Sequence, residues 1–235
     1  MIARTGSIIS SVAPAVINTR LPANNLGVKC VLITAGATLE MIDPVRAITN
    51  LSSGKMGYAI AQAAANMGAN VTLVSGATHL TAPHNVRNIS AISADTMYLA
   101  VMKNINAQDI FISVAAVADY SPTKPSTQKI KKGEASLTLE LKRNKDILAE
   151  VAGLPNAPFC VAFAAETQEL IKLAEQKRIA KKLPLLVANL VSESMGQDEA
   201  SVTLLDAKGA HPLAKSSKTE IAAQILVHLA KLLNA

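Results

Sequence analysis

The stretch that decides the fold is GYAIAQAAANMGANVTLVSG at residues 57–76. In its first half, small and apolar residues recur at helical spacing from Ile60 to Met67, and Gly68 is a typical helix stop. Its second half is a short, β-branched apolar run, as is KCVLITA at residues 29–35, and both are typical of buried strands. The region therefore predicts a strand, a helix and a second strand in succession.

The same alternation continues along the rest of the chain. Strands are predicted over 86–92, 109–118, 159–166 and 183–191, and helices over 94–105, 167–182 and 217–233. Alternating polarity at 135–143 and a hairpin at 200–214 indicate antiparallel additions. This order predicts the α/β class: a Rossmann-like, mostly parallel sheet with helices on both faces and a small antiparallel addition.

The chain divides into a short leader and one domain. Residues 1–27 hold two arginines, no acid and no sustained period. They are interpreted as a flexible tail or the remnant of a linker, with a targeting peptide as the weaker alternative. Residues 28–235 form the predicted domain.

Composition narrows the classes of protein. The chain of 235 residues is 50% apolar and 17% charged, so it can bury a sizeable core. It has no long apolar run, and Cys30 and Cys160 lie far apart in apolar segments, without disulfide or zinc spacing. These features exclude membrane, secreted disulfide-rich and fibrous proteins and predict a cytoplasmic one. The net charge of +6 indicates an anionic partner, and an aromatic content of 3% without Trp disfavours nucleic acid.

The loop after the first strand has the features of a phosphate site. It runs from residue 34 to 57 and ends in Asn50-Leu51-Ser52-Ser53-Gly54-Lys55, directly before the predicted helix. Hydroxyl groups, glycine and lysine at a helix N-terminus direct donors toward an anion. The alternative is an ordinary N-cap and turn, and Asn50 by itself is equally compatible with a turn residue.

A second loop follows the predicted strand at 109–118. Asp119 comes just after the strand, where a nucleotide ribose or a metal would lie, and Lys129 begins the run KIKK. Two prolines between them favour a mobile flap that brings positive charge to a leaving pyrophosphate. A solvated run of charges is the alternative.

The remaining candidates are lysines and histidines. Lys177 and Lys181 stand one turn apart on the helix predicted at 167–182, which suits either an anion or simple solubility. The four histidines are scattered without ligand spacing, so no protein metal site is predicted. They are His79, His84, His211 and His228.

Taken together, the motifs resemble bacterial phosphopantothenoylcysteine synthetase, often the C-terminal half of a bifunctional protein with a flavin-dependent decarboxylase. The resemblance covers about residues 28–234. The matching segments are VLITAG (31–36), IDPVRAITNLSSGKMG (42–57), VTLVSG (71–76), SVAAVADY (113–120), KIKK (129–132), FAAET (163–167), KRIAKK (177–182) and VAN (187–189).

The resemblance implies a CTP-dependent ligase of coenzyme A biosynthesis. The carboxylate of 4′-phosphopantothenate would attack the α-phosphate of CTP, giving an acyl-cytidylate and pyrophosphate, and the amine of L-cysteine would then displace CMP. The family uses Mg²⁺ carried in with the nucleotide phosphates. It also implies a homodimer, with residues 135–143 as a candidate contact, and a decarboxylase domain in the full-length or a neighbouring protein.

The resemblance also assigns residues. Asn50 would hold the phosphopantothenoyl carbonyl during conversion of the acyl-cytidylate, and Lys129 would stabilise charge at the α-phosphate. Ser52, Ser53, Gly54 and Lys55 remain the phosphate-binding loop. The implied nucleotide contacts are Ser113, Val114, Ala115, Asp119, Lys129, Lys145, Asp146, Ile147, Leu148, Phe163, Lys177 and Lys181.

The chain departs from the family pattern at several positions. Ala37 and Leu39 replace a glycine and an arginine, Lys145 replaces a proline, and Ala162 replaces a glycine. Loss of the arginine removes a charge near the expected phosphopantothenate site. A catalytically degenerate nucleotide-binding module therefore stays open, as does a nicotinamide-dependent oxidoreductase, although the first loop lacks the dinucleotide glycines.

Overall fold

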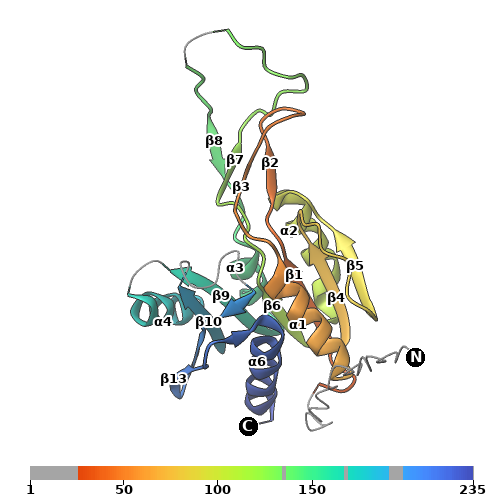
Figure 1. Ribbon diagram of the computed structural model, residues 1–235, viewed down its shortest axis with the longest axis vertical. Helices are drawn as coiled ribbons and strands as arrows, with labels where there is room; N and C mark the ends of the chain where they lie inside the picture. The colour runs from red at the N-terminus through yellow and green to blue at the C-terminus, as the bar shows by residue number, and fades with distance from the viewer. Residues whose placement is uncertain (1–25, 134–135, 167–168, 191–197, 235) are drawn as a thin grey trace, which may run out of the picture.

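The computed structural model describes residues 26–133, 136–166, 169–190 and 198–234 (Figure 1). Most of the predicted tail, residues 1–25, lies outside this description. Leu26 is fully buried in the apolar core, so the end of the predicted tail packs against the domain.

A sheet of eight strands, six of them mutually parallel, forms the centre of the described part. β12 pairs antiparallel with β10 and with β13, which confirms both the mostly parallel sheet and the predicted hairpin. In spatial order the strands are β13 (Gly209–Pro212), β12 (Thr203–Asp206), β10 (Leu185–Leu190), β9 (Phe159–Glu166), β6 (Ile110–Ser113), β1 (Cys30–Ala35), β4 (Asn70–Ser75) and β5 (Val86–Ser90).

Helices cover both faces of this sheet, as the sequence predicts. Successive strand residues face opposite layers: Ile33 packs in the core beneath α1 and α6, whereas Leu32 packs in the core beneath α2, α3 and α4. The helices are α1 (Lys55–Asn66), α2 (Ala94–Asn104), which the 3₁₀ turn η1 (Ile105–Ala107) follows, α3 (Ile147–Ala152), α4 (Leu170–Ala180) and α6 (Lys218–Leu233).

The order of the strands indicates where a ligand would bind. From β1 the chain builds outward through β4 to β5, then returns to β6 on the other side of β1 and continues through β9 to β10. The winding therefore reverses between β1 and β6. In open parallel sheets the crevice at the carboxyl ends of the two strands beside such a reversal holds the ligand.

Two small ribbons form an arm that projects from the sheet (Figure 1). One is the hairpin β2 (Leu39–Met41) and β3 (Ala47–Thr49), and the other pairs β7 (Tyr120–Pro122) with β8 (Leu141–Arg143). A third short pair, β11 (Glu199–Ala200) with β14 (Ser216–Ser217), lies at the start of α6. The sequence predicts long loops where β2, β3 and β7 form, and a strand over 135–143 where β8 forms.

Two predicted strands are shorter than expected. The strand predicted over 109–118 ends at Ser113, because the N–H groups of Val114 and Ala115 turn away to the Thr34 hydroxyl, at 3.2 and 3.3 Å. The strand predicted over 135–143 is formed only in β8. Its partner β7 ends at Pro122, although the next residue, Thr123, still donates its N–H to the Glu140 carbonyl at 2.9 Å.

Close packing of α1 against β1 gives the first testable prediction. A Cβ on Gly57 would lie 2.5 Å from the Cβ of Ala35, which is buried in the core. We expect Gly57→Ala to lower the free energy of unfolding by about 1–3 kcal/mol, since a methyl group forced into a packed core is destabilising. Urea unfolding measures this. Gly133→Ala is the control, because its Cβ would meet nothing within 4 Å, and equal midpoints for the two variants would contradict the prediction.

Candidate active site

A cavity of about 370 Å³ lies at the reversal between β1 and β6. The start of α1 with the chain before it, the chain that follows β6, two residues of β9, and single residues of α4, β10 and α6 form most of its walls. The lining residues are Gly36, Ser52, Ser53, Gly54, Lys55, Met56, Gly57, Val114, Ala115, Ala116, Val117, Phe163, Ala165, Lys177, Asn189, Ala200, Val202 and Lys218.

The N-terminus of α1 forms part of the cavity wall, at the loop where the sequence predicts a phosphate site. Gly54 is the N-cap residue, with φ 80°, and no side chain caps the helix there. A Cβ on Gly54 would lie 3.2 Å from the Gly36 backbone, so glycine serves both the left-handed conformation and the close approach. The first N–H groups of the helix, with the Ser52 and Ser53 hydroxyls in the same wall, suit a phosphate.

Three lysines add positive charge to this cavity. Lys55, Lys177 and Lys218 all line it, and Lys55 also pairs with Asp198 at 2.5 Å. Burial, and then the like charge of Lys55, lower the pKa of Lys218. No Asp or Glu is among the described residues that line the cavity. The arrangement suits a polyanion and offers no carboxylate cage for a bare cation.

A second cavity, of about 750 Å³, shares Ser52, Ser53 and Lys55 with the first. Asn50 and Leu39 line it. The Asn50 side-chain amide donates to the Ala116 carbonyl at 3.0 Å, and Ala116 in turn lines the first cavity. Asn50 therefore lies where the two cavities adjoin, and one of its two amide N–H groups is held by the backbone.

Other predicted residues line the first cavity only in part. Val114, Ala115 and Phe163 line it, with apolar surface that suits a flat base. Ser113, the last residue of β6, is half-buried and is not among the lining residues. Asp119 is exposed, outside both cavities, and its main-chain carbonyl accepts the N–H of Asn144 at 2.8 Å.

The segment 145–148 serves packing and capping in this structure. Asp146 caps α3 by accepting the Ala149 N–H at 3.0 Å, and its other oxygen binds the Lys181 ammonium at 2.5 Å. Lys145 lies 4.0 Å from the centre of the Tyr98 ring. Ile147 and Leu148 are buried in the core. These residues and Lys181 lie outside the cavity.

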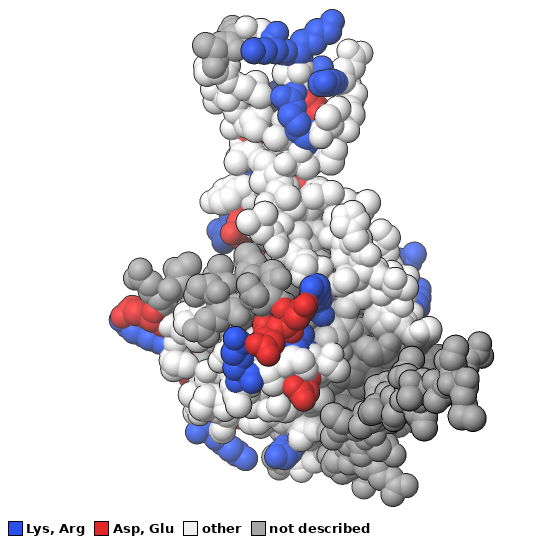
Figure 2. All heavy atoms as spheres, viewed as in Figure 1, with Lys and Arg blue, Asp and Glu red and all other residues white. Residues whose placement is uncertain are grey.

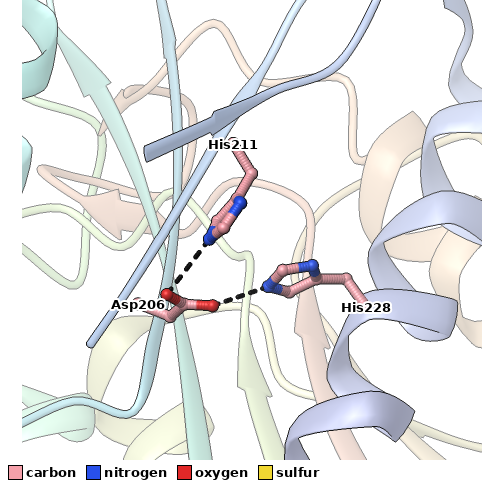
Figure 3. A group of neighbouring side chains, drawn as sticks. All are labelled: Asp206, His211 and His228. Carbon is pink, nitrogen blue, oxygen red and sulfur yellow. Dashed lines mark hydrogen bonds and ion pairs between the residues drawn. The ribbon is translucent and has the colours of Figure 1, made fainter. Parts of the chain in front are cut away.

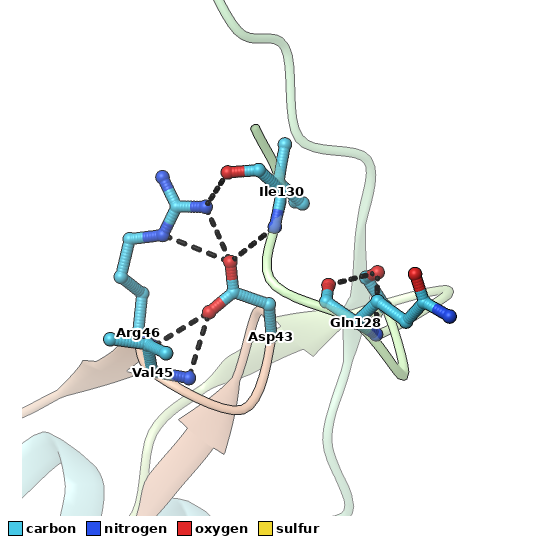
Figure 4. A network of polar contacts seen from close by, with 6 residues as sticks. Asp43, Val45, Arg46, Gln128 and Ile130 are labelled. Carbon is cyan, nitrogen blue, oxygen red and sulfur yellow. Dashed lines mark hydrogen bonds and ion pairs between the residues drawn. The ribbon is translucent and has the colours of Figure 1, made fainter. Parts of the chain in front are cut away.

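Lys129 lies on the arm, and it lines neither cavity. The next residue, Ile130, is held at both main-chain groups: its N–H donates to Asp43 at 3.1 Å, and its carbonyl accepts from Arg46 at 3.0 Å (Figure 4). Arg46, aided by backbone N–H donors and opposed by burial, holds the pKa of Asp43 far below its usual range. Asp43 is buried and stays ionised, so it fixes the base of the Lys129 loop.

The lysines of the arm gather at its tip (Figure 2). In the loop between β7 and β8, Lys124, Lys129, Lys131 and Lys132 are all exposed. The loop that the sequence predicts as a basic flap is therefore basic and solvent-accessible.

Several site residues were absent from the sequence prediction. Lys218 begins the last helix, and Asn189 ends the motif VAN, yet neither was assigned a role, because only the fold brings them to the cavity. His211 and His228, interpreted as scattered, both bind Asp206.

A known protein family matches the part of the chain that contains these features. The family model described as the DNA/pantothenate metabolism flavoprotein C-terminal domain matches residues 26–233. The chain belongs to this family. The match begins at the buried Leu26 and includes the cavity and the arm. It ends at Leu233, the last residue of α6.

Relatives of known sequence and structure agree with the family. Coenzyme A biosynthesis bifunctional protein CoaBC of Vibrio vulnificus (strain CMCP6) is 48% identical over 211 residues, which cover 87% of this chain and 53% of that protein. The protein of the same name from Bacillus subtilis (strain 168) is 43% identical over 209 residues, covering 87% and 52%. The chain thus spans about half the length of these relatives.

A solved structure confirms the fold. The crystal structure of the C-terminal domain of a CoaBC protein aligns with a TM-score of 0.76 and 38% identity, covering 89% of this chain and 97% of that one.

Among the described residues, no helix is both long enough and apolar enough to cross a membrane.

Proposed function

We propose that this chain is a CTP-dependent ligase that joins 4′-phosphopantothenate to L-cysteine in coenzyme A biosynthesis. The observation that carries the proposal is the three-lysine cavity at the N-terminus of α1, which adjoins a second cavity at Asn50. The first cavity suits a nucleoside triphosphate, and the second suits the acid to be activated. The family and its relatives named for coenzyme A biosynthesis support the same assignment.

In the first step, the carboxylate of phosphopantothenate attacks the α-phosphate of CTP, and the bond to pyrophosphate breaks. Lys55, Lys177 and Lys218 bind phosphate oxygens, and Lys129 stabilises the charge that develops at the α-phosphate. Mg²⁺ would enter on the phosphates of CTP and offset their charge, since the lining residues described above include no carboxylate to hold it.

In the second step, the amine of cysteine attacks the acyl carbon, the bond to CMP breaks and the amine loses a proton. Asn50 donates to the acyl oxygen with the amide N–H that Ala116 does not hold. This role places the acyl group where the two cavities meet.

The other predicted contacts complete the nucleotide site. Val114, Ala115 and Phe163 would lie against cytosine, together with Ser113 at the end of β6. The contacts of Asp119, the segment 145–148 and Lys181 rest on the resemblance alone, and they require these residues to approach the nucleotide from outside the cavity.

We also propose that the protein is a cytoplasmic homodimer. A decarboxylase domain would belong to the full-length protein or to a neighbouring one. Leu137, Leu139 and Leu141 alternate along the arm with exposures of 57%, 36% and 43%. Leu137 and Leu139 precede β8 and Leu141 begins it, so the three leucines form an exposed apolar row along the sequence. A second copy of the arm would cover this row, as expected for the region at 135–143.

Release of pyrophosphate from CTP tests the ligase directly. With Mg²⁺ and 4′-phosphopantothenate present, we expect pyrophosphate to appear, and CMP and the amide to follow when cysteine is added. Release that does not depend on phosphopantothenate would contradict the proposed reaction.

Leu39 favours a second candidate, a nucleotide-binding module without ligase activity. It places an apolar side chain in the second cavity where the resembled family has an arginine. CTP binding measured by calorimetry, without pyrophosphate release, would support this candidate, and Leu39→Arg would then restore release.

Lys218 should contribute to CTP binding. We expect Lys218→Met to weaken CTP binding roughly tenfold to a hundredfold, because a hydrogen bond to a charged group contributes about 1.5–3 kcal/mol. Calorimetric titration with CTP measures the change. Lys231→Met, at an exposed position in the last turn of the same helix, is the control. Equal affinities for both variants would exclude Lys218 from the site.

A further inference from the structure

Three potential metal ligands lie close together at the β12–β13 edge of the sheet, away from the proposed active site. They come from separate elements: Asp206 ends β12, His211 lies on β13, and His228 lies on α6 (Figure 3). The Nε2 atom of His211 is 3.1 Å from Oδ1 of Asp206, and that of His228 is 2.8 Å from Oδ2. None of the three lines either cavity.

The carboxylate is fixed in position before any ion binds. The Asp206 side chain is 2% exposed, and the Lys208 N–H in the hairpin turn donates to Oδ1 at 2.7 Å. A donor of this kind orients a metal-binding carboxylate from behind. The imidazoles are more accessible, at 37% exposure for His211 and 20% for His228, which leaves a path for an ion and for a water ligand.

The spacing of these atoms suits a small tetrahedral ion. Zinc binds nitrogen and oxygen at about 2.0–2.1 Å, so neighbouring ligands of one tetrahedron lie about 3.4 Å apart. Here the donor atoms of all three residues lie within 4.8 Å of one another. Both imidazoles direct Nε2 at the carboxylate, so an ion between the three groups requires only small side-chain movements.

The surrounding charges allow a cation at this place. Arg178 on α4 is a positive group that interacts electrostatically with Asp206. It is held by Glu175 through two hydrogen bonds of 2.7 Å, so a negative group offsets its charge.

We propose that Asp206, His211 and His228 bind one divalent transition-metal ion of the zinc type. Two imidazoles with one carboxylate favour zinc, cobalt or nickel over Mg²⁺ or Ca²⁺, which prefer oxygen ligands alone. The ion would join the β12–β13 hairpin to α6, the helix whose first residue, Lys218, lines the first cavity. Its role is to stabilise this end of the fold, and it is separate from the Mg²⁺ expected with CTP.

Cobalt and zinc titrations of the tag-free full chain test the site. We expect Co²⁺ to bind one ion per chain with the visible absorption of tetrahedral coordination, and Zn²⁺ to displace it. Zn²⁺ should also raise the midpoint of thermal unfolding, because a ligand that binds only the folded state stabilises it. His211→Ala and His228→Ala should each weaken binding by more than the roughly 10- to 100-fold that loss of an outer-shell partner causes.

The control is His84→Ala, which removes an exposed histidine just before β5, at the opposite edge of the sheet, and should leave metal binding unchanged. Circular dichroism checks that each variant folds. If His228→Ala does not fold, His211→Ala decides alone, since its side chain is the more exposed. Absence of one-to-one binding, or equal binding by the parent and His211→Ala, would overturn the proposal and leave the three residues as a hydrogen-bonded contact.

Discussion

Lys129→Gln should slow the release of pyrophosphate from CTP by about a thousandfold or more. Glutamine keeps much of the length and some hydrogen-bonding capacity, but it removes the positive charge. Side chains that bring a cation to a transferring phosphoryl group contribute about 10³–10⁵ to the rate. Because activation precedes amide formation, no acyl-cytidylate should accumulate in this variant. A quenched single turnover with labelled CTP measures both products.

The arm explains why this effect should fall on the rate of activation more than on CTP binding. Lys129 is exposed and lines neither cavity, whereas Lys55, Lys177 and Lys218 line the first one. CTP can therefore bind without Lys129, which would join the phosphates only when the basic loop closes over a site. Asp43 fixes the base of that loop through Ile130.

The matched control is Lys124→Gln, which removes an exposed lysine from the same arm. It should leave pyrophosphate release within about twofold of the parent, because exposed single charges contribute little. If Lys129→Gln released pyrophosphate at the parent rate, the loop would have no part in activation.

A mixture of two variants that are each defective in amide formation would show whether Lys129 acts in the site of its own chain or in that of the partner. Chains with Lys129→Gln and chains with Asn50→Asp are combined under conditions that exchange subunits. If the arm of one copy completes the site of the other, mixed dimers contain one intact site or none according to how the two residues are shared. Recovered activity would assign Lys129 and Asn50 to different chains at each site, and no recovery would assign them to the same chain.

The sequence predicts the sheet well, and the loop that it assigns to phosphate lies at the first cavity, because both depend on neighbouring residues. Short apolar runs such as FCVAFAAE at 159–166 have one favourable place, a strand buried on both faces, and this strand forms as predicted. Ser52 to Lys55 reach the first cavity because a loop before a helix carries its donors with it. Local chemistry was therefore sufficient for these parts.

The arm and the remote site residues depend on contacts that no local pattern encodes. The β2–β3 hairpin has strands of three residues, too short for a periodic signal. Lys218 reaches the cavity because α6 packs beside α1, and His228 on the same helix meets Asp206 at the end of β12. Only the complete fold brings together residues that lie far apart along the chain.

Asn50→Asp should have the opposite kinetic signature to Lys129→Gln. We expect pyrophosphate release to continue while amide formation slows by about 10²–10³, so that the acyl-cytidylate accumulates. Removal of one donor to a developing oxyanion has an effect of this size. An aspartate at position 50 would lose the bond to the Ala116 carbonyl and place a negative charge beside the acyl oxygen. Quenched single turnovers, with and without cysteine, separate the two steps.

Asn88→Asp is the control, because it makes the same chemical change at an exposed position on the edge strand β5. It should leave both steps unchanged. If Asn50→Asp slowed activation and amide formation equally, Asn50 would be a general binding residue of the second cavity. A selective loss of the second step would instead require its amide to act on the acyl group itself, since the same variant would still bind CTP and form the intermediate.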